Sequence, residues 1–417
     1  MLLLFLAVPV AYGDGLQKVM PHRAVDFTNS IGVNTHFGYY DTQYGLYDSL
    51  LRPRLLELGV KHIRDGTFNE DVARKYRDVG KTGVRLLLIT SGKRLPREAE
   101  AIGSMLWGVE AVNEPDRSRK TDWVKYARDE QRMLYETAKS DDATRHLQVV
   151  GVSLANIRNS PSQLGDMSQW MDYGGMHPYA AGQYPSKHWG WGLTMEAALA
   201  ETRKVSADKP LIATECGYHN KQNNPNHPGV SEQAAAIYHL HMFFIYFSNG
   251  IKRCYKYELL DLKPDDRIAD MECHFGLVRS DGSVKPSFVA IRNLLRILAD
   301  NDTVRKCTPL ALEVEAPAGV TVRTTLLQKS DGSWWVALLR ETEAYDVKQK
   351  KDIQVSPVNV CVRTGHKLAA RTYIPNKSDM PVAHYDHSDT FTLSVGAEVV
   401  LMELRTVKAV RTIKSSP

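Results

Sequence analysis

The sequence predicts an α/β protein, built as a (β/α)8 TIM barrel with a small C-terminal antiparallel β-sandwich domain. Over about residues 28 to 300, short apolar runs alternate with longer segments of helical periodicity, in eight strand and helix pairs. After about residue 301 the pattern changes to short alternating stretches divided by turn sequences such as SDGS and PNKSD. Eight pairs favour a closed barrel, and an open parallel sheet is the alternative.

The expected barrel strands are short apolar runs followed by polar or turn residues, which is typical of parallel strands covered on both faces. They lie at residues 30–37, 59–66, 83–90, 107–113, 147–154, 173–179, 210–217 and 251–259. Expected helices pass through residues 50–56, 96–105, 122–139, 232–247 and 288–299. Thr67 and Glu70 have capping-box spacing, so a further helix should begin there. Ser231 is an expected N-cap and Gly250 an expected helix end.

Three segments are predicted along the chain: a signal peptide over residues 1–13, the barrel over 14–300 and the sandwich over 301–410. The opening MLLLFLAVPVAYG has a short apolar core and small residues near Gly13, which indicates export, although no Lys or Arg precedes it. A truncated N-terminus or a first buried strand is the alternative. The apolar run is too short to span a bilayer, so no integral membrane segment is expected. Residues 14–29 could add a strand to the sandwich.

Composition excludes several classes of function. The chain is 43% hydrophobic and 24% charged, which is ordinary for a globular protein. A net charge of +5 from scattered Lys and Arg residues gives no support for nucleic acid binding. Five cysteines without CxxC spacing indicate neither a disulfide scaffold nor a zinc module. Cys216 and Cys254 fall on neighbouring expected strands, where a bridge is possible and buried free thiols are favoured.

Polar residues collect where the expected strands end, and in a barrel these ends meet at one mouth. Glu114 closes the fourth strand and Glu215 the seventh, so the two carboxylates should face each other. A facing carboxylate pair is the basic apparatus of glycosidic bond hydrolysis. The polar residues expected at the mouth are His36, Arg64, Asp65, Asn113, Glu114, His177, Tyr179, Glu215, Tyr255 or Tyr257, and Glu258.

The motifs AVNEPD, MHPY and IATECG, in this order, resemble those of the clan A retaining β-glycosidases, which include glycoside hydrolase families 5 and 39. The resemblance covers about residues 28 to 300. It implies that Glu114 is the general acid and base and Glu215 the nucleophile. Asn113 resembles the residue that hydrogen-bonds the sugar 2-hydroxyl, and Arg64 resembles the arginine that keeps the nucleophile ionised.

The same resemblance pairs His177 with Tyr179 and makes Tyr179 the candidate donor to Glu215. It implies double displacement through a covalent glycosyl-enzyme on a carbohydrate substrate, with no metal or cofactor. Glu114 should be protonated at rest, because the nearby charge of Glu215 would raise its pKa. Alternatives are a transglycosylase using the same glutamates and a catalytically inactive carbohydrate-binding barrel. Protein partners and the sugar are not predicted.

The remaining candidates have a packing interpretation beside the functional one. The loop AGQYPSKHWGWG holds Tyr184, His188, Trp189 and Trp191, which form an expected sugar-stacking wall or, alternatively, pack over the barrel rim. His36 is either a subsite ligand or a hydrogen-bonded barrel histidine. Asp65 is expected to pair with Arg64 or to cap the following helix.

Overall fold

The barrel unit comprises residues 28–296 together with residues 343–354. The computed structural model describes residues 16–263, 271–301 and 306–406. The predicted signal peptide, residues 1–13, therefore lies outside the described part of the chain. Eight parallel strands follow the order β7-β6-β5-β4-β3-β10-β9-β8, and a parallel bridge between Val150 and Tyr173 joins the two end strands. The predicted barrel is thus confirmed.

The barrel strands are shorter than the apolar runs predicted. They are β3 (Ile31–Asn34), β4 (His62–Asp65), β5 (Arg85–Ile89), β6 (Leu106–Glu110), β7 (Gln148–Val150), β8 (Gly174–Met176), β9 (Leu211–Cys216) and β10 (Ile251–Lys256). Their residues are almost all buried, because side chains fill the barrel on one face and the helices cover the other. Asn113 and Glu114 therefore stand a few residues beyond the strand end, in the loop that follows β6.

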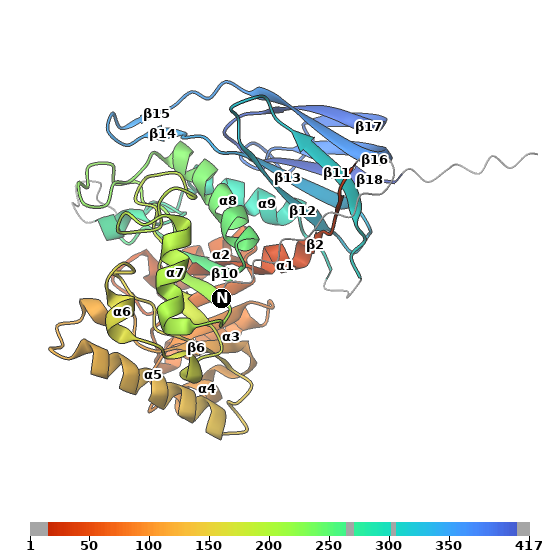
Figure 1. The fold of residues 1–417 in the computed structure, drawn as a ribbon. Helices are drawn as coiled ribbons and strands as arrows, with labels where there is room; N and C mark the ends of the chain where they lie inside the picture. Colours follow the sequence, from red (N-terminus) through yellow and green to blue (C-terminus); the bar gives the residue numbers. More distant parts are fainter. Residues whose placement is uncertain (1–15, 264–270, 302–305, 407–417) are drawn as a thin grey trace, which may run out of the picture. The chain divides into compact units, whose positions relative to one another are not determined.

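Helices surround these strands, and Figure 1 shows α3 to α7 around β6 and β10. The helices are α2 (Arg52–Leu58), α3 (Glu70–Gly80), α4 (Leu95–Ile102), α5 (Trp123–Ser140), α6 (Ser160–Leu164), α7 (Met195–Ser206), α8 (Glu232–Ser248) and α9 (Pro286–Ile297). Ser231 caps α8 as predicted, since its hydroxyl accepts from the Ala234 amide. The prediction of a capping box at Thr67 is wrong, because the Asn69 side chain caps α3 and accepts from the Val72 amide.

Short turns of 3-10 or π-helix complete the barrel unit at the strand ends. They are η1 (Gln43–Gly45), η2 (Tyr47–Leu51), η3 (Gly103–Met105), η4 (Pro115–Arg117), η5 (Ser168–Trp170) and η6 (Met271–His274). Cys216 and Cys254, on adjacent strands β9 and β10, are both buried free thiols. No helix in the described ranges is long and apolar enough to cross a membrane.

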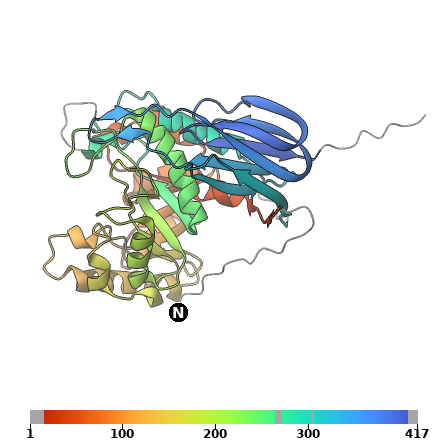
Figure 2. The same cartoon turned by 45° about the horizontal axis from the view of Figure 1, so that its top comes forward.

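The second unit is a sheet of eight strands in the order β1-β11-β16-β18-β13-β12-β2, with β17 beside β16 (Figure 2). Its elements are β1 (Lys18–Val19), β2 (His22–Arg23), α1 (Ala24–Asn29), β11 (Leu310–Glu315), β12 (Val322–Gln328), β13 (Trp334–Arg340), β16 (Val358–Tyr373), β17 (Ala383–Val395) and β18 (Val400–Arg405). Every neighbouring pair is antiparallel except β2 with β12. The predicted N-terminal strand addition is seen in β1 and β2.

Strand β16 lets this sheet fold around one core. Its first half pairs with β11 and its second half with β18, while its pairing with β17 shifts register between Arg363 and Leu368. Strands that change partners at such irregularities form the corners of sandwiches. Buried side chains such as Val362, Phe391 and Met402 fill the interior.

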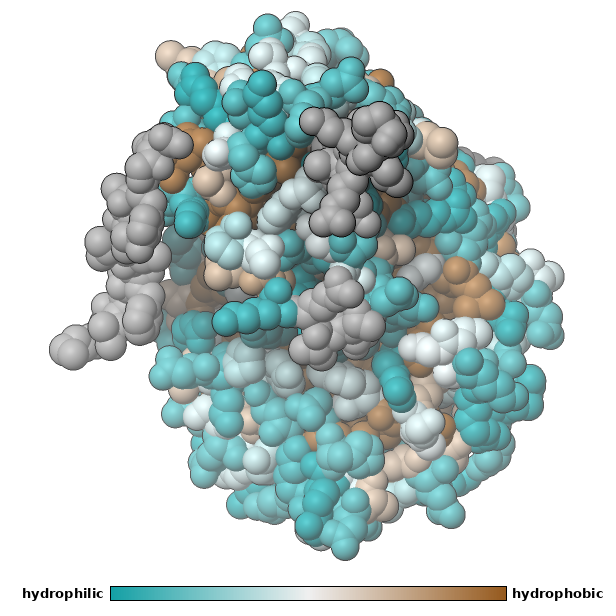
Figure 3. Space-filling view, turned by 90° about the vertical axis from the view of Figure 1, so that its right-hand side faces the viewer, coloured by the Kyte–Doolittle hydropathy of each residue, from teal (hydrophilic) through white to brown (hydrophobic). Residues whose placement is uncertain are grey.

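The face of the molecule drawn in Figure 3 is mostly hydrophilic, with hydrophobic residues in small separate groups.

One segment is placed differently from the predicted boundaries. Residues 343–354 follow β13 in the sequence, where the sandwich was expected, but they belong to the barrel unit. Within them, β14 (Tyr345–Asp346) and β15 (Lys351–Asp352) form a two-stranded hairpin. Tyr238 of α8 donates from its hydroxyl to Glu343 (3.0 Å) and accepts from the Ala344 amide (2.9 Å). These bonds fix the hairpin to the barrel.

Candidate active site

The loop after β6 holds Glu114 in a left-handed backbone conformation, with φ of 43°. Such a conformation costs a non-glycine residue about 1–3 kcal/mol and persists only when its surroundings impose it. The Glu114 amide donates to the Ser153 carbonyl (3.1 Å), and Pro115 starts η4 directly afterwards. The carboxylate is thereby held at the barrel mouth, where its side chain is 17% exposed.

Arg64, at the end of β4, is a buried cation whose guanidinium binds several residues of the site. Its Nε donates to Glu110 (2.6 Å), its Nη1 to Glu215 (2.8 Å) and its Nη2 to Asn113 (2.7 Å). The Arg64 side chain is only 2% exposed, so these contacts replace the water it loses. Burial opposes the charged form, but the two carboxylates outweigh it, and the pKa of Arg64 is raised.

Glu215, at the end of β9, has both carboxylate oxygens engaged. Oε1 accepts from Arg64, and Oε2 accepts from the Tyr179 hydroxyl at 2.9 Å. The pKa of Tyr179 is well above its ordinary value because the phenol is buried and faces this carboxylate. The phenol therefore stays protonated and donates. Two fixed donors leave the carboxylate a single orientation.

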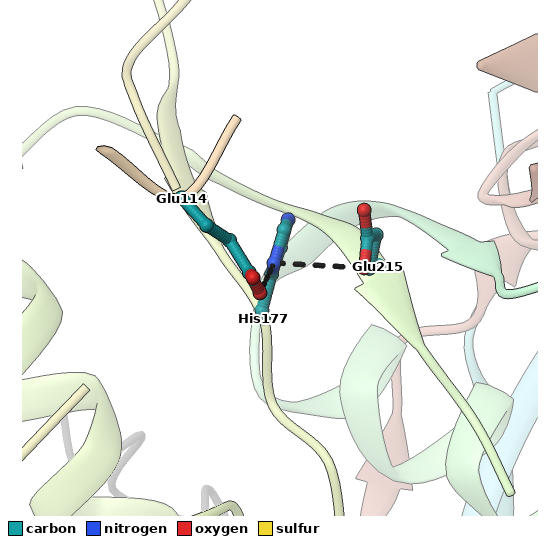
Figure 4. A group of neighbouring side chains, drawn as sticks. All are labelled: Glu114, His177 and Glu215. Carbon is teal, nitrogen blue, oxygen red and sulfur yellow. Dashed lines mark hydrogen bonds and ion pairs between the residues drawn. The ribbon is translucent and has the colours of Figure 1, made fainter. Parts of the chain in front are cut away.

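His177, which follows β8, lies between the two glutamates (Figure 4). Its Nδ1 is 2.8 Å from Glu114 Oε1 and 3.7 Å from Glu215 Oε2, and its Nε2 is 3.0 Å from the Thr214 hydroxyl. Burial lowers the pKa of His177, but Glu215 and Glu114 raise it more, so the net shift is upward.

The pKa of Glu114 is shifted in the opposite direction from the one expected. Burial raises the pKa of this carboxyl, but the hydrogen bond and charge of His177 lower it more, with a smaller contribution from Arg117. The expected rise in the pKa of Glu114 is therefore wrong. The pKa values of the two groups shift in opposite directions, and a 2.8 Å hydrogen bond joins them.

Glu110 is a site residue that the sequence analysis missed. It ends β6, is fully buried and accepts from Arg64, from Thr214 (3.0 Å) and from Ser153 (3.1 Å). A buried carboxylate needs such partners. The signal was present in the sequence, because a charged residue inside an apolar strand must find a cation. Its partners come from β4, β9 and the segment after β7, which the sequence alone does not bring together.

His36 and Glu258 form a separate buried pair. His36 Nε2 lies 3.1 Å from Glu258 Oε2, and its ring stacks on Tyr39 with centroids 4.4 Å apart. Tyr44 donates to the same carboxylate oxygen at 2.9 Å. Burial raises the pKa of Glu258 despite these partners. The contact is an ion pair, so the two expected roles of His36, subsite ligand and hydrogen-bonded barrel histidine, both stay predictions.

Asp65 does not take either expected role. It accepts hydrogen bonds from the amides of Phe37 (2.8 Å), Gly66 (2.7 Å) and Thr67 (3.0 Å), and from the Thr35 hydroxyl (2.9 Å). Its short side chain folds back onto the backbone of two loops. The expected pair with Arg64 and the expected helix cap are therefore wrong, and Asp65 positions the loops that follow β3 and β4.

A cavity of about 1220 Å³ opens over this site. Asn113, Glu114, His177, Tyr179, Glu215 and Tyr257 all line it, so the structure brings these candidates together. Arg64 lies behind them. The segment of residues 343–354, which holds the hairpin of β14 and β15, forms part of the cavity wall. The residues of this segment that line the cavity are Glu343, Tyr345, Asp346, Val347, Lys348 and Ile353.

The expected aromatic wall divides into two kinds of residue. Trp191 lines the cavity and is 55% exposed. Trp189 is fully buried, packs on Tyr246 with ring centroids 4.5 Å apart and donates to the Pro185 carbonyl. Tyr184 is also buried and bonds His241. Trp189 and Tyr184 are therefore packing residues, which corrects the expected sugar contact, because the loop turns them toward α8.

Glu114, His177 and Glu215 are also the described residues whose donor atoms could together hold a metal ion. These atoms lie within 4.8 Å of one another. A metal requires an unprotonated imidazole, whereas the pKa of His177 is raised. The guanidinium 2.8 Å from Glu215 also repels a cation. Both features oppose the binding of a metal ion by these atoms.

The fold resembles that of solved glycoside hydrolases at low sequence identity. A family 39 glycoside hydrolase from Bacteroides cellulosilyticus WH2 gives a TM-score of 0.57 at 14% identity, covering 93% of this chain and 83% of that one. A glucosidase from Croceicoccus marinus gives 0.60 at 10% identity, covering 94% and 98%. A GH51 arabinofuranosidase from Xanthomonas axonopodis pv. citri gives 0.55 at 12%, covering 94% and 97%. The predicted resemblance to such barrels is confirmed for the fold.

No protein-family model and no curated protein matches the chain.

Proposed function

We propose that this protein is a retaining glycoside hydrolase that cleaves β-glycosidic bonds in an oligo- or polysaccharide. One observation carries the proposal: a carboxylate oxygen of Glu114 lies within 4.8 Å of one of Glu215. Retaining enzymes place the two carboxyl groups about 5–5.5 Å apart, whereas inverting enzymes need about 6.5–9.5 Å for a water molecule. The short spacing suits direct attack by one carboxylate.

In the first step, a Glu215 oxygen bonds to the anomeric carbon as the glycosidic C–O bond breaks. The leaving oxygen takes a proton from Glu114, which draws it from His177 across their 2.8 Å hydrogen bond. In the second step, a water oxygen bonds to the anomeric carbon and its proton goes to Glu114. The bond to Glu215 breaks as the new C–O bond forms, and the sugar leaves with retained configuration.

Asn113 supports this mechanism through the orientation of its amide. Its Oδ1 accepts from Arg64 at 2.7 Å, which leaves the NH2 group as the donor toward the cavity that it lines. A sugar 2-hydroxyl can accept this bond, and such a bond strengthens as the ring becomes oxocarbenium-like. Arg64 therefore orients both Glu215 and Asn113.

Two alternatives use the same residues. A transglycosylase would pass the glycosyl group to a second sugar, and its products would include chains longer than the substrate. An inactive carbohydrate-binding barrel would bind glycans without turnover. The paired glutamates with their oriented partners favour an enzyme over a binder.

The test is hydrolysis of a panel of 4-nitrophenyl β-glycosides. We expect turnover by the wild type and its loss in Glu215→Gln, with the thermal unfolding transition retained. Glu100→Gln is the matched control, because Glu100 is an exposed residue of α4 that does not line the cavity. Unchanged turnover in Glu215→Gln would refute the nucleophile assignment, and no turnover of any β-glycoside or β-glycan by the wild type would refute the enzyme.

A further inference from the structure

Trp191 is an exposed aromatic residue in a rigid setting. It is 55% exposed although it lines the cavity, and most indoles are largely buried. Its φ is 50°, between Gly190 and Gly192 with φ of 96° and 71°. Three successive residues in the left-handed region form a sharp turn, which is unfavourable for the tryptophan in the middle. The turn presents the indole to the cavity.

Hydrogen bonds within the loop and to Ala155 fix this turn. The Gly192 amide donates to His188 Nε2 at 2.8 Å. The Trp189 amide donates to the Leu193 carbonyl, and the Leu193 amide to the Gly190 carbonyl, both at 3.0 Å. The Trp191 indole donates to the Ala155 carbonyl at 2.6 Å. Since that bond uses the indole N–H, the remaining contact surface of Trp191 is the aromatic ring.

The same bond places Trp191 on the Glu114 side of the cavity. The amides of Ala155 and Asn156 donate to the two carboxylate oxygens of Asp116 at 3.0 and 2.8 Å. Asp116 is two residues beyond Glu114, whose own amide donates to Ser153. Glu114, Asp116 and the indole of Trp191 are therefore joined through one short segment, residues 153–156.

This position has a consequence for the substrate, because Glu114 is the group that protonates the leaving oxygen. Glu215 attacks the opposite face of the anomeric carbon, so the leaving group must lie on the Glu114 side. Sugar rings have an apolar face that packs on aromatic rings. An immobile ring loses little conformational entropy when it binds such a face.

We propose that Trp191 is the stacking platform of the leaving-group subsite and selects substrates whose leaving group is itself a sugar. The inference rests on the proposed function and extends it. The platform also binds an acceptor sugar after the first step. The acceptor hydroxyl oxygen then bonds to the anomeric carbon, its proton goes to Glu114, and the bond to Glu215 breaks. Trp191 thus governs the partition between transfer and hydrolysis.

The test compares two substrates of one sugar that differ in the leaving group. The probes are a β-glycosyl fluoride, whose small leaving group makes no contact with Trp191, and the matching β-linked trisaccharide. The sugar series is the gluco-, xylo- or manno-series that the wild type cleaves. Each is measured in Trp191→Ala, in Trp191→Phe and in the wild type, with thermal unfolding as a check on folding.

We expect Trp191→Ala to lose about tenfold in kcat/KM on the trisaccharide, the scale of one aromatic contact. Its kcat/KM on the fluoride should stay within about twofold of the wild type, and Trp191→Phe should recover most of the loss because it keeps a ring. With the fluoride as donor and the disaccharide as acceptor, Trp191→Ala should form less transfer product.

Two results would overturn the proposal. An equal loss on both substrates would place Trp191 against the sugar that reacts with Glu215, and an unchanged trisaccharide rate would remove it from the subsite. Failure of the wild type on the fluorides and trisaccharides of all three sugar series is a different outcome, since it counts against the proposed hydrolase itself. The rates on the fluoride therefore distinguish failure of the proposed subsite from failure of the proposed hydrolase function.

Discussion

The guanidinium of Arg64 lies 2.8 Å from the Glu215 carboxylate, and both side chains are buried. The same guanidinium also donates to Glu110, Asn34 and Asn113. The orientations of the Glu215 carboxylate, of the Asn113 amide and of the buried Glu110 carboxylate therefore depend on a single residue.

Replacing Arg64 should destabilise the fold as well as the site. Arg64→Met leaves Glu110 and Glu215 without their cation, and removing one partner of a buried ion pair costs about 3–5 kcal/mol. Urea unfolding measures the change. Arg97→Met is the matched control, because Arg97 pairs with Glu70 at the surface, where both side chains are more than 70% exposed and such pairs contribute about 0–1 kcal/mol. Equal unfolding midpoints for both variants would contradict the account.

Replacing His177 should move the alkaline limb of the pH–rate profile to lower pH. In the wild type the pair with Glu114 keeps its proton up to the raised pKa of His177. In His177→Asn only the Glu114 carboxyl can hold the proton, and a carboxyl loses it at lower pH than an imidazole. The profile of kcat/KM reports this limb. Exposed His146 provides the control His146→Asn, and a limb that stays in place in both variants would refute the shared proton.

The two loop tryptophans should respond oppositely to truncation. Trp189 is fully buried, so Trp189→Ala opens a cavity and should cost about 3–5 kcal/mol of unfolding free energy. Trp191→Ala should change that free energy by less than about 1 kcal/mol, since the ring is 55% exposed. Denaturant unfolding separates the two. A large destabilisation from Trp191→Ala would mean that its ring serves packing.

Lys256, buried at the end of β10, should make stability depend on pH. Burial, with the charge of Lys285, lowers the pKa of Lys256 to about 7. Between that pH and its ordinary pKa near 10.4, the unfolded chain binds a proton that the folded chain lacks. Stability of the wild type should therefore rise with pH relative to Lys256→Met, by up to about 1.4 kcal/mol per pH unit.

Unfolding free energies of the wild type and Lys256→Met, measured from about pH 7 to about pH 10, give the difference in slope. Exposed Lys252 on the same strand provides the control Lys252→Met, which should follow the wild type. Parallel curves for the wild type and Lys256→Met would show that Lys256 stays charged in the fold.

The sequence predicts the barrel because its signals are local. Each strand is a short apolar run, and barrel closure then brings the ends of β6 and β9 to one mouth, with Glu114 and Glu215 close to each other. The positions of Arg64 and Tyr179 follow from the same rule. The residues that lie at the strand ends can therefore be predicted from periodicity and strand order alone.

The rest depends on contacts that periodicity does not encode. Trp189 and Trp191 are two residues apart, yet a left-handed turn buries one ring and exposes the other. The hairpin at residues 343–354 joins the barrel unit through Tyr238 and Glu343, which are distant in sequence. The proton between His177 and Glu114 depends on a 2.8 Å contact between two loops.

The central claim is that Glu215 forms a covalent bond to the sugar. A 2-deoxy-2-fluoro β-glycoside with a good leaving group slows the second step and traps this intermediate, and peptide mass spectrometry locates it. The sugar series is the one that the wild type cleaves. We predict a single label on Glu215, and a label on Glu114 or any other residue would contradict the account.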